Sequence, residues 1–280
     1  MTPRREFLPA IRAALAGRYE VDREIARGGA ARVYAGRAPG GHPVAVKILH
    51  PELAVSVTAE RFLREVQFLR RITHPHIGRV LDSGEADYLL YFVMDWIEGP
   101  TLRQHVEKVR RASLSDVHRI ARDLLNALGY AHDLGIAHRD VKPENVVLAA
   151  NGAVLLDFGI AKAIAESGVT RLTRSGFTVG TSAYMSPEQV AGVQDIDHRT
   201  DLYSLACVLF EALAGRPPFV HAKEEVVLRL QQTEEAPDVR QFRKDTPAPL
   251  ADMIARALKK DRDERWKSAG EMRQAVERQM

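Results

Sequence analysis

The sequence contains little cysteine and no long apolar run. Cys207 is the single cysteine among 280 residues, which excludes an internal disulfide and is typical of a reducing compartment. It lies in the apolar run 205–210, where a packed, unreactive thiol is expected. No segment approaches the roughly 20 consecutive apolar residues of a membrane-spanning helix. We therefore expect a cytoplasmic chain; the cytosolic domain of a longer, membrane-anchored protein is the alternative.

An excess of charge of one sign is also lacking. Lysine and arginine total 40 against 37 acidic residues, so the net charge of +3 does not predict a nucleic-acid partner. The ten histidines form no HExxH-type pair, so no zinc site is expected. Tracts rich in Gly, Ser or Pro are missing, and 45% of the residues are apolar, which predicts that most of the chain folds.

The apolar patterns change along the chain from the period of strands to that of helices. Residues 18–49 predict three strands separated by Gly- and Pro-containing turns, and residues 58–72 predict a helix. Two more strands are expected at 80–81 and 89–93, with a turn between them at 82–85. Helices are predicted in the rest of the chain at 101–109, 115–134, 198–214, 223–232, 247–258 and 268–279.

This order predicts an α+β fold with two lobes. An N-terminal helical extension (1–17) precedes a small lobe with a five-stranded antiparallel sheet and one main helix (18–96), and a large, mainly helical lobe follows (97–280). The helix of the extension, over 7–15, is expected to pack on the small lobe; a dimer or partner contact is the alternative. Segment 201–214 is apolar on nearly every face, which predicts a helix buried in the large lobe.

Two short motifs indicate the chemistry. HRDVKPEN occupies residues 138–145, and DFG follows at 157–159 after a short strand. Phosphoryl transfer needs a carboxylate at the nucleophile, a cation at the moving phosphoryl group and oxygen ligands for a metal. The two motifs together supply all three, in an order that random sequence rarely produces.

With these motifs the chain resembles the Hanks-type (eukaryotic-like) Ser/Thr protein kinases, and bacterial members in particular, over roughly residues 18–275. The resemblance implies that Asp140 accepts or orients the proton of the substrate hydroxyl and that Lys142 neutralises charge at the γ-phosphate of ATP. Asn145 and Asp157 would bind Mg²⁺, with Mn²⁺ as the alternative.

The same resemblance identifies a nucleotide site. Lys47, at the end of the strand motif VAVK, matches the lysine that contacts the α- and β-phosphates, and Glu65 is its expected partner. The nucleotide loop keeps only Gly28 of G-x-G-x-x-G, because Ala26 and Ala31 occupy the other glycine positions. Alanine does not tolerate a positive φ, so a weaker or slower ATP clamp is expected. The remaining contacts implied are Val33, Ala45 and Val147 around the adenine ring, Met94 as gatekeeper, and the backbone of Asp95 and Ile97.

Other matches concern the acceptor and the framework of the site. Lys142 and Thr181 resemble the residues of Ser/Thr kinases rather than tyrosine kinases, which implies Ser or Thr acceptors. Glu188 is expected to form a structural ion pair with Arg265. Asp201 matches a buried helix aspartate that hydrogen-bonds the backbone of the catalytic loop.

Regulation is predicted in the segment between Asp157 and Glu188. Thr173 and Ser175 best match the positions that are autophosphorylated in bacterial relatives. A phosphate on either residue would dock in a pocket of positive charge and order the segment. The predicted pocket consists of Arg139, Lys162 and Arg61.

These features predict an ATP- and Mg²⁺-dependent protein Ser/Thr kinase whose partners are protein substrates. A homodimer for autophosphorylation in trans is a further expectation. A pseudokinase that acts as a nucleotide-binding scaffold is the first alternative, because two loop glycines are missing. A small-molecule phosphotransferase is the second, although the platform at 180–188 argues against it.

Overall fold

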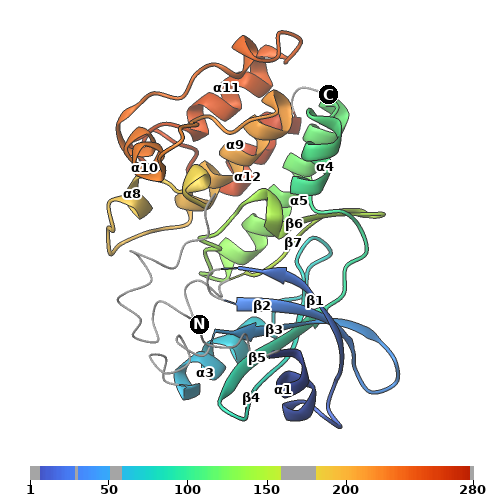
Figure 1. Ribbon diagram of the computed structural model, residues 1–280. Helices are drawn as coiled ribbons and strands as arrows, with labels where there is room; N and C mark the ends of the chain where they lie inside the picture. Colours follow the sequence, from blue (N-terminus) through green and yellow to red (C-terminus); the bar gives the residue numbers. More distant parts are fainter. Residues whose placement is uncertain (1–6, 29–30, 51–58, 159–180, 278–280) are drawn as a thin grey trace. The chain divides into compact units, whose positions relative to one another are not determined.

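The computed structural model describes residues 7–28, 31–50, 59–158 and 181–277 (Figure 1). The side chains of Arg61, Glu65 and Thr181 also lie outside the described part. These residues fall in two compact units. The first contains the described residues before His74 together with Arg79–Trp96, and the second contains His74–Gly78 and the described residues from Ile97 onward.

The first unit is built on an antiparallel sheet with the strand order β1-β2-β3-β5-β4. Its five strands are β1 (Glu20–Arg27), β2 (Ala31–Arg37), β3 (Pro43–Leu49), β4 (Val80–Ala86) and β5 (Leu89–Asp95). Helix α3 (Ala59–Leu69) packs on β4 through a face that buries Phe62 and Val66. The five-stranded sheet and the main helix that were predicted are therefore confirmed.

The predicted turn at 82–85 is wrong, because those residues belong to β4. The chain reverses instead at Asp87 and Tyr88, which have φ values of 46° and 63°. A two-residue turn with both φ angles positive matches the twist of paired strands. Gly84 has a packing role: a β-carbon there would lie 2.7 Å from the hydroxyl of Tyr91, its neighbour on β5.

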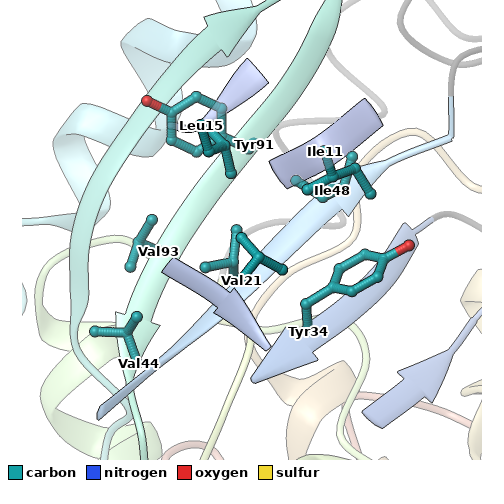
Figure 2. Close-up of a cluster of buried hydrophobic side chains, with 9 residues drawn as sticks. Ile11, Leu15, Val21, Tyr34, Val44, Ile48, Tyr91 and Val93 are labelled. Carbon is teal, nitrogen blue, oxygen red and sulfur yellow. The ribbon is translucent and has the colours of Figure 1, made fainter. Parts of the chain in front are cut away.

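Helix α1 (Phe7–Ala14) covers one face of this sheet (Figure 2). The α1 residue Ile11 and the following Leu15 are each 1% exposed and lie among inward-facing residues of the strands. The prediction that this helix packs on the small lobe is confirmed. The cluster consists of Ile11, Leu15, Val21, Tyr34, Val44, Val46, Ile48, Tyr91 and Val93.

The second unit is mainly helical. Its helices are α4 (Leu102–Val109), α5 (Leu114–Asp133), α8 (Pro187–Val190), α9 (Arg199–Ala214), α10 (Glu224–Thr233), α11 (Ala248–Ala257) and α12 (Ala269–Glu277), with short 3₁₀ turns η1 (Pro143–Asn145), η2 (Thr181–Tyr184) and η3 (Val239–Gln241). A two-stranded sheet of β6 (Val146–Ala149) and β7 (Gly152–Leu155) follows η1. The sequence indicated one short strand here, whereas the structure has a hairpin.

Helix α9 forms the core of the second unit. Every residue after Arg199 in this helix is buried, as predicted from its apolar faces. Cys207 lies within it, and burial raises the pKa of its thiol to about 12. The helix ends at Ala214 and is capped by Gly215, whose φ of 78° suits glycine. Among the described residues, no helix is long and apolar enough to cross a bilayer.

Candidate active site

The loop between α5 and β6 holds a partly exposed carboxylate between two donors. Lys142 Nζ lies 2.8 Å from Asp140 Oδ2 and 3.0 Å from Oδ1. Asn145 Nδ2 donates to the backbone oxygen of Asp140 at 2.8 Å and to Oδ2 at 3.1 Å. The Asp140 side chain is 27% exposed. The three residues that the motif places near each other in sequence therefore meet at one carboxylate.

Two residues of the site have left-handed backbone conformations that are uncommon outside glycine. Arg139 and Asp157 both have φ of 65°. Such residues cost free energy and persist where their surroundings hold them. The carbonyl of Arg139 accepts a hydrogen bond from Gln189 Nε2 at 2.8 Å, and its amide donates to Asp201 at 2.7 Å.

Asp201 anchors the catalytic loop from α9. Its fully buried carboxylate accepts hydrogen bonds from the backbone amides of His138 and Arg139, each at 2.7 Å. His132 Nε2 lies 2.8 Å from Oδ2. Burial opposes ionisation of Asp201, but the hydrogen bond and charge of His132 outweigh it, so the pKa is lowered. The predicted contact between Asp201 and the loop backbone is present.

The catalytic loop is joined to the segment that carries Asp157. The buried ring of His138 contacts the carbonyl oxygen of Leu156 through Nε2 at 2.7 Å and packs edge-on against Phe158. Leu156 in turn donates its amide to the backbone oxygen of Asn145 at 2.8 Å. These bonds fix the backbone around Asn145 and Asp157, the two residues predicted to bind metal.

The predicted ion pair between Glu188 and Arg265 is also present. Both guanidinium NH groups of Arg265 lie 2.8 Å from the carboxylate oxygens, and the Arg265 side chain is fully buried. Arg265 further donates to the carbonyl oxygens of Lys259 and Lys260 at 2.7 and 2.9 Å. The pair thus holds α8 against the loop before α12.

Sequence reasoning missed a second polar cluster beside the catalytic loop. Arg103 on α4 lies 2.8 Å from Glu144 and 2.5 Å from Glu211, and it also donates to the hydroxyl of Tyr184. Glu144 belongs to the HRDVKPEN motif, but no spacing pattern connects it with a residue 41 positions earlier.

The first unit carries the predicted phosphate-binding lysine on the sheet face opposite α1. Lys47 lies opposite Val33 on β2 and Phe92 on β5, and its ammonium is 5.6 Å from the centre of the Phe92 ring. Ala45 lies opposite Met94 on the same face. The side chain of Glu65 lies outside the described residues.

The nucleotide loop connects the paired strands β1 and β2, with a register shift between Glu24 and Ala26. Ala26 pairs with Val33, and Gly28 donates its amide to the carbonyl oxygen of Ala31 at 2.8 Å. Residues 29–30 lie outside the described part. The carbonyl oxygen of Gly28 lies 3.0 Å from Nε2 of the His50 ring. The described ends of the loop are therefore paired as strands up to Arg27 and Arg32.

The other predicted adenine contacts belong to both units. Asp95, at the end of β5 in the first unit, donates its amide to the carbonyl oxygen of Arg79 at 3.1 Å. Ile97 and the buried Val147 on β6 belong to the second unit. The predicted regulatory residues Thr173, Ser175 and Lys162, and the side chain of Arg61, lie outside the described part.

Comparisons with known proteins identify the family to which this sequence is similar. Residues 19–279 match the model of the protein kinase domain family. The chain is 42% identical over 272 residues to a probable serine/threonine-protein kinase of Streptomyces coelicolor, covering 94% of the chain and 40% of that protein. It is 39% identical over 267 residues to the serine/threonine-protein kinase PknB of Mycobacterium tuberculosis, covering 92% of the chain and 42% of that protein. It therefore spans about two fifths of the length of these curated relatives.

Proposed function

The chain belongs to the protein kinase domain family, and on this premise we propose that it transfers the γ-phosphoryl group of ATP to Ser or Thr hydroxyls of proteins. The observation that carries the proposal is the Asp140 carboxylate, held by Lys142 and Asn145 and still partly exposed. A carboxylate so held accepts or orients the proton of an incoming hydroxyl. Lys142 offsets the negative charge of the phosphoryl group.

We propose Mg²⁺ as the metal, with Asn145 and Asp157 as its protein ligands. Both offer hard oxygen donors, and the Asn145 amide nitrogen already donates to Asp140, so its Oδ1 is the atom suited to a cation. Mg²⁺ bound with ATP supplies charge neutralisation of the phosphates. Mn²⁺ accepts the same oxygen ligands and is the alternative.

The nucleotide is proposed to bind through the residues that the sequence predicts. Lys47, paired with Glu65, is proposed to contact the phosphates of the nucleotide. The start of the nucleotide loop, from Ala26 to Gly28, is proposed to cover these phosphates. Because the Asp95 amide is already used, this residue offers only its carbonyl oxygen to adenine, while Ile97 offers backbone groups. The apolar side chains proposed to contact the ring are Val33, Ala45, Met94 and Val147.

A phosphate-dependent activation step is also proposed. Arg139 donates from NH2 to the carbonyl oxygen of Ile196 at 3.1 Å, while its buried Nε has no hydrogen-bond partner among the described residues. A phosphate on Thr173 or Ser175 would satisfy this donor. Lys162 and Arg61 are the further proposed cations.

Phosphorylation of one subunit by the other within a homodimer is the proposed route of activation. The cytoplasm, which supplies ATP, is the proposed location of the protein.

The test of the main proposal uses Asp140→Asn beside the wild type, with radiolabelled ATP and Mg²⁺. Loss of the base lowers the rate by about 10²–10⁴-fold, while nucleotide affinity stays within about twofold. Asp133→Asn, an exposed position on α5, is the matched control and keeps full activity. Nucleotide binding by the wild type without any labelled protein would instead indicate the scaffold. Label on a small molecule alone would indicate the small-molecule phosphotransferase.

A further inference from the structure

Helix α1 contacts both strands that carry the nucleotide loop. On the β1 side, Arg12 Nε donates to the carbonyl oxygen of Val21 at 2.6 Å. On the β2 side, the guanidinium carbon of Arg32 lies 4.3 Å from the centre of the Phe7 ring. Arg32 is on the α1 face of β2, two residues before Tyr34, which belongs to the buried cluster beneath the helix (Figure 2). The helix therefore holds β1 and β2 together from one face of the sheet.

Arg32 also joins the two strands at their last pair before the loop. Arg27 on β1 is its register partner, and like charges directly opposite each other on paired strands repel. The Glu24 carboxylate bridges them, 2.7 Å from Arg27 Nε and 3.5 Å from Arg32 NH1. The Arg32 side chain is 19% exposed and that of Arg27 is 59% exposed. A continuous set of contacts thus runs from Phe7 through Arg32 and Glu24 to the base of the loop.

Two alanines make the ends of the loop part of the strands. Ala26 lies in β1 and Ala31 in β2, and neither has the positive φ that glycine would allow. Ala31 is 3% exposed and pairs with Leu49 on β3. Its carbonyl oxygen accepts a hydrogen bond from the amide of Gly28 at 2.8 Å. The direction in which the loop leaves the sheet therefore depends on how β1 and β2 are held.

We propose that Phe7 is a positioning residue for the nucleotide loop, because its contact with Arg32 fixes the base of that loop from the α1 face of the sheet. The next residue, Val33, lies on the opposite face, where the nucleotide is proposed to bind. A displacement of Arg32 would move Val33 with it. The inference rests on the proposed function, since it concerns the nucleotide of that reaction. Phe7 acts through Arg32 and does not itself touch ATP.

The test compares Phe7→Ala with the wild type at a temperature at which both are folded. The Kd of a fluorescent ADP analogue with Mg²⁺ is measured by titration, and KM for ATP and kcat are measured with a peptide substrate. Losing a partly exposed cation–π contact should raise both the Kd and KM for ATP about two- to fivefold. The peptide KM and kcat should not change, because a higher nucleotide KM at constant kcat indicates lost ground-state binding.

Further variants make the result specific to the ring and its cation. Phe7→Trp keeps an aromatic face and should retain the wild-type Kd, whereas Phe7→Leu keeps only apolar bulk and should behave like Phe7→Ala. Adding Phe7→Ala to Arg32→Gln should have no further effect, because the two residues act through one contact. Tyr88→Ala truncates an 88% exposed aromatic ring in the turn between β4 and β5, and it should keep the wild-type constants.

Several outcomes would overturn the inference. A wild-type Kd in Phe7→Ala, even with lower stability, would show that Phe7 only stabilises the sheet. An equal increase in Tyr88→Ala would show that the effect is not specific to α1. If Phe7→Ala does not fold, a wild-type Kd in both Phe7→Leu and Arg32→Gln has the same meaning. The Kd values separate the two proposals: the expected pattern without phosphoryl transfer would refute the proposed activity alone, and transfer with equal Kd values would refute the role of Phe7 alone.

Discussion

Replacing Asp201 with asparagine removes the negative charge that holds two backbone amides of the catalytic loop and the His132 ring of α5. The carboxylate accepts from the amides of His138 and Arg139 at 2.7 Å and contacts His132 at 2.8 Å. Asparagine keeps one acceptor oxygen and turns an NH₂ group toward at least one of these partners. A charge-assisted hydrogen bond is then lost, and a buried donor is left unpaired.

The magnitude follows from these two losses. A hydrogen bond to a charged group contributes about 1.5–3 kcal/mol, and an unpaired buried donor costs about 1–3 kcal/mol. We therefore expect Asp201→Asn to lower the free energy of unfolding by about 4 kcal/mol. Activity should fall further than stability alone requires, because Asp201 also holds Arg139 at its positive φ, next to Asp140.

Urea unfolding followed by tryptophan fluorescence measures the loss of unfolding free energy. A kinase assay without urea, at a temperature where both proteins are fully folded, measures the loss of activity.

The pH dependence of stability adds a check with a defined sign. The pKa of Asp201 is lowered from 3.8, so its stabilising contribution is present above that pH and is lost as the pH falls through the lower folded value. The asparagine variant should therefore lose stability less steeply in acid. A change below about 1 kcal/mol with activity intact, comparable to Asp133→Asn, would refute the argument.

Three further predictions concern the framework. Glu188→Gln leaves the buried Arg265 guanidinium without a counter-charge, so the free energy of unfolding should fall by about 3–5 kcal/mol in urea titrations, and an unchanged midpoint would contradict this. Gly84→Ala places a methyl group 2.7 Å from the Tyr91 hydroxyl and should destabilise by about 1–3 kcal/mol; wild-type stability would mean that the sheet adapts. Cys207, with a raised pKa of about 12, should resist iodoacetamide at pH 8 until denaturant is added, and labelling of the native protein would refute its burial.

Much of this architecture could be predicted because periodicity and motif spacing are local signals. The buried helix α9 was evident from its apolar faces, and α1 from the spacing of Ile11 and Leu15. The turn between β4 and β5 could not be predicted, because Gly84 resembles a turn residue until the packing of Tyr91 is known. Local composition does not reveal which side chain of a neighbouring strand packs over a glycine.

The site shows the same limit. The contacts among Asp140, Lys142 and Asn145 follow from close sequence spacing. The cluster of Arg103 with Glu211 joins residues 108 positions apart, and only the packing of α4 on the neighbouring elements brings them together. The left-handed conformation of Arg139 was equally hidden, since it depends on hydrogen bonds from α8 and to α9.

Helix α1 determines which surface of the sheet unit is open to other molecules. Ile11 and Leu15 are buried on the sheet, and the Arg12 side chain donates to the backbone oxygen of Val21 at 2.6 Å. Displacing two such apolar side chains costs about 3–6 kcal/mol, comparable to the whole binding energy of a millimolar complex. A regulator that bound this face of the sheet would have to displace α1. Because α1 is part of the same chain, its local concentration at this face is very high.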